Sequence, residues 1–190
     1  MKFRSTTLFL SSVLCCVAPV GAQKFDYRLL ATSKTSTMEK EINQAADAGF
    51  VFGGVMGGES SIGGKEVIVV MTKDTDAPAA SRKYRVLATA RTGTLQKELQ
   101  QGGDEGFAYC GQTVFESAFG GREVAVILER IADTKVKRIE YKLLATSRTS
   151  TMEKELREAG EAGFKFLDVV VGKTALGGKE VISILQKVGK

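Results

Sequence analysis

The chain has 190 residues, of which 43% are hydrophobic and 26% charged, and its formal net charge is +5. This composition is typical of a globular protein and excludes a collagen, a low-complexity polymer and a multi-span membrane protein. The sequence contains no histidine and no tryptophan, so the commonest general base and the commonest zinc ligand are missing, and with them every Ser-His-Asp or Cys-His arrangement. We expect no cofactor and no metal, and the composition favours a binding or structural protein over an enzyme.

Residues 1–22 have the features of an export signal peptide. Lys2 and Arg4 supply a positive start, the run from Thr7 to Val17 is apolar and uncharged, and Val20-Gly21-Ala22 offers a small-residue cleavage site. The apolar run is too short to span a bilayer. We therefore expect a bacterial protein that is exported to the periplasm or the extracellular space, with no membrane span in the mature chain.

The mature chain would carry 25 basic and 22 acidic residues, which is nearly balanced. Basic and acidic side chains alternate along almost every segment, and this pattern argues against nucleic-acid binding, which usually shows as a basic stripe. Cys15 and Cys16 would leave with the signal peptide, so Cys110 would be the last cysteine and no disulfide is expected. The stability of the chain must then come from a packed core.

Three tandem copies follow the signal peptide. Tyr27, Tyr84 and Tyr141 are spaced 57 residues apart, and the same offset relates glycines 49, 106 and 163 without an insertion or deletion. The copies occupy residues 23–72, 82–130 and 138–190. Residues 35–41 and 149–155 share the sequence Thr-Ser-Thr-Met-Glu-Lys-Glu.

Each copy begins with a predicted strand and helix. In the third copy, residues 141–145 alternate as a strand, and Ser150 with Glu153 forms the pattern of a capping box at the start of a helix. The expected buried stripe of the helix is Met152, Leu156 and Ala159. Gly163 stands where a left-handed residue ends a helix, and the phenylalanine after it would complete a Schellman motif. The tyrosine at the start of each first strand is expected to be half-buried, with its hydroxyl at the rim.

A β-hairpin is predicted after each helix. In the third copy it comprises Phe164–Val171, a turn that ends at Gly177-Gly178, and Glu180–Leu185. We interpret the other glycine pairs, 53-54, 57-58, 63-64 and 120-121, as hairpin turns as well. The fold class is thus α+β, with three tandem β-α-β-β repeats whose helices pack on mainly antiparallel or mixed sheet. The third strand of each copy is expected between the first two.

One copy is too small for a core of its own, so neighbouring copies must pack together. The sequence leaves open whether they close around a pseudo-threefold axis or form an array.

The segment from Glu155 to Phe166, with Ala159-Gly160-Glu161-Ala162-Gly163-Phe164 at its centre, resembles the domain of unknown function 4177 family. A Tyr141-Lys142 strand precedes this segment and a short hairpin follows it. The resemblance covers most of each copy. It implies a small bacterial domain and no catalytic residues, because the family has no assigned activity.

The loop before each helix is the candidate binding site. It brings hydroxyl groups, a basic side chain and free N–H groups of a helix N-terminus together, and this combination suits an anionic ligand. Helix capping and Ser/Thr turns would also account for the hydroxyl groups. The alternative to an anion site is therefore a loop whose role is structural, at the start of a helix. The candidate residues are Lys34, Thr35, Ser36, Arg91, Thr92, Arg148, Thr149 and Ser150.

Catalysis by carboxylates is the alternative function. Glu66, Glu123 and Glu180 begin the last strand of each copy, but a single carboxylate per copy lacks the partner that acid–base hydrolysis needs. Cys110 corresponds to Leu167 in the third copy, so we expect a buried, inert thiol there. The sequence thus predicts an exported, non-catalytic module that binds an anionic ligand or a protein partner or has a structural role. A carboxylate- or lysine-dependent hydrolase or transferase of the cell envelope remains the alternative.

Overall fold

The structure is a computed structural model, and it describes residues 24–59, 65–77, 80–116, 122–132, 135–173 and 179–189. The predicted signal peptide and the glycine pairs at 63-64, 120-121 and 177-178 lie outside the described residues.

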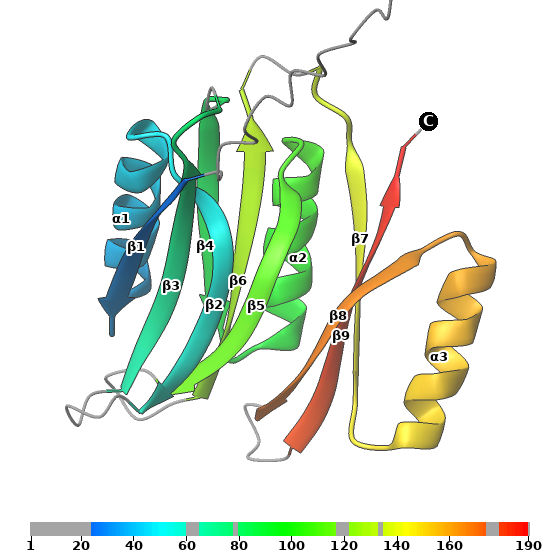
Figure 1. Cartoon of the computed structure of the whole chain (residues 1–190). Helices are drawn as coiled ribbons and strands as arrows, with labels where there is room; N and C mark the ends of the chain where they lie inside the picture. The colour runs from blue at the N-terminus through cyan, green and yellow to red at the C-terminus, as the bar shows by residue number, and fades with distance from the viewer. Residues whose placement is uncertain are drawn as a thin grey trace, which may run out of the picture.

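The described residues form nine strands and three helices in the order β-α-β-β, three times over (Figure 1). The first copy contains β1 (Phe25–Thr32), α1 (Thr35–Asp47), β2 (Val51–Glu59) and β3 (Lys65–Asp74). The second contains β4 (Arg82–Thr89), α2 (Thr92–Asp104), β5 (Ala108–Glu116) and β6 (Arg122–Ile131). The third contains β7 (Ile139–Thr146), α3 (Thr149–Glu161), β8 (Lys165–Lys173) and β9 (Lys179–Val188). The α+β class is therefore confirmed.

Each copy builds a three-stranded sheet, and the strand orders are β1-β3-β2, β4-β6-β5 and β7-β9-β8. Both pairings in each sheet are antiparallel. The prediction that the third strand lies between the first two is confirmed, and so is the hairpin of β8 and β9. Each second strand carries a bulge, which falls at Gly53, Cys110 and Leu167.

The three sheets stack as an array, with the second sheet between the first and the third (Figure 1). The clearest sign is β6, which is buried from Val124 to Leu128 on both of its faces. Ala125 and Ile127 pack with residues of the first copy, whereas Val126 and Leu128 pack with residues of the third. Two apolar clusters of the described residues therefore lie between copies, as the small size of one copy requires, and a smaller third cluster lies between α3 and its own sheet.

The helix ends match the prediction. Gly49, Gly106 and Gly163 have φ of 87°, 79° and 87°, the left-handed region that glycine adopts without strain. After α1, the Gly49 N–H donates to the Ala46 carbonyl and the Phe50 N–H to the Ala45 carbonyl, at 2.9 and 3.0 Å. These two bonds are the Schellman motif.

The predicted capping box of Ser150 and Glu153 does not form. α3 begins at Thr149, the residue before it is Arg148 in an extended conformation, and no side chain caps the helix. Ser150 therefore lies inside the first turn, and Glu153 instead bonds Arg157 one turn later at 2.9 Å. In the first two copies the residues that correspond to Glu153 bind a strand of the next copy, which explains why the capping pattern misleads.

Two glycine pairs that were predicted to be hairpin turns, 53-54 and 57-58, lie inside β2. At Gly57 the reason is a close approach between copies, since an added Cβ would be only 2.3 Å from the Val114 carbonyl oxygen of β5. The Gly57 N–H also donates to Thr113 Oγ1 at 2.7 Å. Glycine here lets two sheets meet, which is a use of glycine in strands.

Candidate functional site

The first helix closes the free edge of the second sheet with its side chains. Asn43 Nδ2 donates to the Tyr84 carbonyl of β4 at 2.9 Å, and the Tyr84 N–H donates back to Asn43 Oδ1 at 3.0 Å. One turn earlier, Glu39 Oε2 accepts the Val86 N–H at 2.8 Å. These polar side chains take the place of a neighbouring strand for both backbone groups of Tyr84 and for the N–H of Val86.

The second helix does the same to the third sheet. Gln100 Oε1 accepts the Tyr141 N–H of β7 at 3.0 Å, and Gln100 Nε2 lies 3.3 Å from the Ile139 carbonyl. Gln96 accepts the Leu143 N–H at 2.7 Å and donates to the Tyr141 carbonyl at 2.9 Å. A helix of one copy on the first strand of the next is thus the recurring junction of this molecule.

Among the described residues, no helix lies beside β1 in the way that α1 lies beside β4 and α2 beside β7. Tyr27 of β1 is 66% exposed, whereas its counterparts Tyr84 and Tyr141 are each 3% exposed. The expectation of three equivalent, half-buried tyrosines is therefore wrong, because burial at this position depends on a preceding copy. Five large hydrophobic side chains are exposed on this side of the first sheet, which we call the leading face: Phe25, Tyr27, Leu29, Met56 and Val70.

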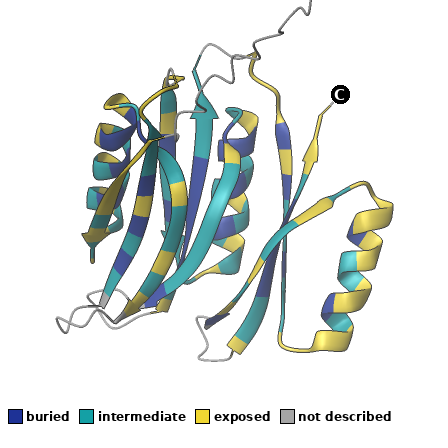
Figure 2. Cartoon of the chain, in the orientation of Figure 1, coloured by how far each residue is buried: buried dark blue, intermediate teal, exposed yellow. Residues whose placement is uncertain are grey.

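The opposite end of the stack is also open. α3 buries only Met152 and Ala159, whereas α1 and α2 each bury four residues. Figure 2 shows the contrast between the mostly yellow α3 and the dark blue positions of α2. On β8, Phe166, Val169 and Val171 are exposed. We call these three residues and the open side of α3 the trailing face.

Sequence reasoning missed both faces. A usable pattern exists, because polar side chains at i and i+4 recur on the helices: Glu39 with Asn43, and Gln96 with Gln100. Their place next to the buried stripe indicates a polar partner beside the helix, but it does not identify that partner as the backbone of another copy.

The predicted anion loops form a tight turn in each copy. The backbone N–H of Lys34, Arg91 and Arg148 donates to the threonine hydroxyl two residues earlier, at 3.1, 3.1 and 3.2 Å. The threonine is thus engaged by its own loop, as in an ordinary Ser/Thr turn. The basic side chains are exposed, and each stands directly before the first residue of its helix.

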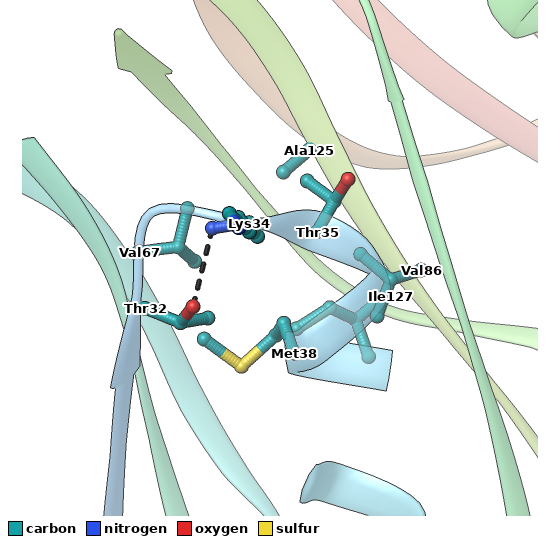
Figure 3. Close-up of a pocket in the computed structure, with 8 residues that line it drawn as sticks. All are labelled: Thr32, Lys34, Thr35, Met38, Val67, Val86, Ala125 and Ile127. Carbon is teal, nitrogen blue, oxygen red and sulfur yellow. Dashed lines mark hydrogen bonds between the residues drawn. The ribbon is translucent and has the colours of Figure 1, made fainter. Parts of the chain in front are cut away.

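The loop of the first copy lies over an apolar floor (Figure 3). Met38, Val86 and Ile127 line the space beneath Lys34 and Thr35, and this space is too narrow to admit a water molecule. On the other side, Thr35 and Ser36 line an open depression of about 330 Å³ together with the carboxylates Glu39 and Glu98. Those carboxylates oppose an anion at the loop of the first copy.

The loops do not surround a common threefold axis, because the copies stack. All three helices start at the lower end of the molecule in Figure 1, but each helix starts beside its own sheet. Each loop would therefore act alone.

Cys110 belongs to a polar cluster between the first two sheets. Its sulfur lies 4.0 Å from Glu129 Oε2, and that carboxylate also accepts the Tyr84 hydroxyl at 2.7 Å and pairs with Arg82. The Phe52 N–H donates to the same Tyr84 hydroxyl at 3.0 Å. Burial raises the pKa of the Cys110 thiol to about 12, and Glu129 adds to the shift. The pKa of the Tyr84 hydroxyl is also raised, mainly by burial.

The candidate catalytic carboxylates are not brought together. Glu66, Glu123 and Glu180 each lie near the start of the central strand of a different sheet. Within the described residues no group of three or more Cys, Asp or Glu side chains has the arrangement of a metal site. No helix in the same part of the chain is long and apolar enough to cross a membrane.

Comparison of the chain with protein families, with curated proteins and with solved structures finds no match.

Proposed function

We propose that this chain is an exported, non-catalytic module that binds a protein partner through the leading face. The observation that carries the proposal is the exposure of Tyr27 on a strand whose two counterparts are buried by a neighbouring copy. A contiguous group of exposed apolar side chains on a soluble domain marks an interaction surface. Export to the periplasm or beyond, and kinship with the domain of unknown function 4177 family in three tandem copies of period 57, are parts of the same proposal that rest on the sequence.

A photo-crosslinking amino acid placed at Leu29 tests the binding surface in the producing cells. We expect light-dependent adducts from position 29 and none from the matched position Val136, an exposed valine outside both faces. Cell fractionation shows whether the chain is exported. Absence of any adduct from position 29 would overturn the binding proposal.

An activity screen tests the non-catalytic part. The chain is purified from the producing cells in the form in which they make it, and it is assayed against panels of hydrolase and transferase substrates. Turnover that is abolished by changing Glu66, Glu123 or Glu180 to glutamine would show that the enzyme alternative is right.

Anion binding at the pre-helix loops is a second candidate function. It is favoured by the exposed basic residue before each helix, namely Lys34, Arg91 and Arg148. Calorimetry with sulfate in low salt should show binding that weakens as ionic strength rises, because screening shortens the reach of exposed charges to about 8 Å at 0.15 M. A triple change of these residues to glutamine should abolish the binding and keep the fold, since exposed ion pairs contribute only about 0–1 kcal/mol each. Equal sulfate binding by the triple variant would show that these loops are not anion sites and serve only to start the helices.

A further inference from the structure

We propose that the partner of the leading face is the trailing face of a second copy of this chain, so that chains join head to tail. The inference rests on the proposed function, in which the leading face binds a protein, and it names that protein. Each chain then offers one free face of each kind.

The junction already exists twice inside the molecule. α1 packs beside β4 and α2 beside β7, so α3 is the one described helix without a following first strand. The first seven residues of α3 are identical to those of α1, and β1 repeats the Tyr-basic-Leu-Leu-Ala-Thr sequence of β7. α3 of one chain and β1 of the next therefore carry the two halves of the recurring junction.

The sheets offer a second match. Phe52 of β2 packs over Gly111 of β5, where an added Cβ would be 3.1 Å from the ring. At the next junction, Tyr109 of β5 donates its hydroxyl to Asp168 of β8 at 2.7 Å. The next aromatic in this series is Phe166, which is 46% exposed.

In head-to-tail assembly, Phe166 of one chain would pack over Gly54 on the leading face of the next chain. Gly54 is the counterpart of Gly111, and an added Cβ there would meet nothing within 4 Å. It pairs with Val70, which in turn pairs with Leu29. An exposed ring at one end of the stack thus matches an open glycine among apolar side chains at the other.

A small residue on the helix gives a third match. Gly103 of α2 lies so close to β7 that an added Cβ would be 2.1 Å from the Ile139 carbonyl oxygen. Its counterpart in α3 is Gly160, which is exposed and has open space around it. α3 keeps the glycine that lets a helix approach a strand closely, although no described strand lies there.

The charges at the two ends are complementary as well. Asp104 at the end of α2 pairs with Arg138 just before β7 at 2.7 Å. The corresponding residues at the free ends are Glu161 of α3 and Lys24 before β1, again an acid and a base. Opposite charges at equivalent positions favour this register over others.

The hydrogen-bonding groups fit the same register. The Tyr27 N–H of β1 donates to Asp26 Oδ1 at 2.8 Å, so a helix placed beside β1 would have to offer Tyr27 a donor for its carbonyl and no acceptor for its N–H. Arg157, the counterpart of Asn43 and Gln100, can only donate. Glu153, the counterpart of Glu39, can accept the Leu29 N–H as Glu39 accepts the Val86 N–H. A contact between unlike faces is heterologous, so it continues into a filament unless it closes into a ring.

Size-exclusion chromatography with light scattering tests the proposal on the chain purified from the cells that produce it. Mass spectrometry identifies the N-terminal residue of that chain. The measured mass should rise with concentration beyond the monomer. Leu29→Glu on the leading face and Phe166→Glu on the trailing face should each weaken association at least about tenfold, since both remove an apolar contact at the centre of a face. Val136→Glu is the matched control, and it should assemble like the wild type.

Mixing the two variants gives the sharpest result. Leu29→Glu keeps its trailing face and Phe166→Glu keeps its leading face, so an equimolar mixture should form a dimer that contains one of each and grow no further. A wild-type chain that stays monomeric at every concentration would overturn the proposal. A dimer that Leu29→Glu abolishes and Phe166→Glu leaves intact would overturn it too, because leading faces would then be pairing with each other.

The crosslinking experiment separates this inference from the proposed function. Adducts from position 29 to residues of α3 in another copy support both. Adducts to a different protein alone would sustain the proposed function and overturn head-to-tail assembly. No adduct at all would overturn both.

Discussion

Asn43 of α1 forms two hydrogen bonds with Tyr84 of β4, one to its carbonyl and one from its N–H. The side-chain amide thereby presents the same donor and acceptor that a neighbouring strand would offer. A helix side chain thus closes a sheet edge, which otherwise would be a template for pairing with another chain. At Tyr141 two side chains share this task, because its N–H donates to Gln100 and its carbonyl accepts from Gln96.

Replacing Asn43 with alanine should lower the free energy of unfolding by about 1–3 kcal/mol, because it leaves two part-buried backbone groups of Tyr84 without partners. Urea denaturation measures the loss. Gln44→Ala, at the exposed neighbouring position, is the control and should be close to neutral. Equal stability of the two variants would show that water replaces Asn43 at no cost.

Leucines at equivalent helix positions should differ in their contribution to stability. Leu99 of α2 is fully buried, whereas Leu156 of α3 is only partly buried. Leu99→Ala should cost about 2–5 kcal/mol, the usual range for a buried leucine, and Leu156→Ala clearly less under conditions in which the chain is monomeric. Denaturation midpoints that shift equally would contradict the open trailing face.

The glycines that end the helices permit a graded test. Gly163→Ala places a Cβ in a left-handed conformation, with its nearest neighbour 3.7 Å away on Lys187, so it should cost about 1–2 kcal/mol of conformational strain alone. Gly106→Ala should cost more, because its Cβ would also be 2.7 Å from Val136 Cγ1. Thermal unfolding of the two variants compares them, and a larger loss for Gly163→Ala would contradict this packing.

Stability should fall as the pH rises above about 9. Burial raises the pKa of the Cys110 thiol from 9.0 to about 12, so above pH 9 the thiol ionises first in the unfolded chain. This contribution is fully present below pH 9 and is lost as the pH approaches 12. The raised pKa of Tyr84 acts in the same direction.

Urea denaturation from pH 7 to pH 11 checks the dependence, with Cys110→Ala as the control that removes the contribution of the thiol. Iodoacetamide should also modify Cys110 much more slowly in the folded chain than in urea, because the thiolate is the reactive form. Fast labelling of the folded chain at pH 8 would contradict the raised pKa.

The sequence alone determined the local elements of this protein. The change of hydrophobic period at Tyr141 and again at Phe164, and the glycines at 49, 106 and 163, predict the strand, helix and hairpin of each copy. These features act within one copy: a left-handed glycine ends a helix whatever lies around it, and side-chain periodicity follows from backbone geometry.

Only the tertiary structure decided what each copy packs against. Tyr27 and Tyr84 have the same local sequence role, yet one is exposed and the other is buried, because α1 lies beside β4 and no described helix lies beside β1. Glu39 and Glu153 share the sequence of a capping box, but Glu39 binds a strand of the next copy and Glu153 binds Arg157. Burial and pairing at these positions depend on a neighbour that lies beyond the reach of a local pattern, so the candidate binding faces emerged only once the copies were stacked.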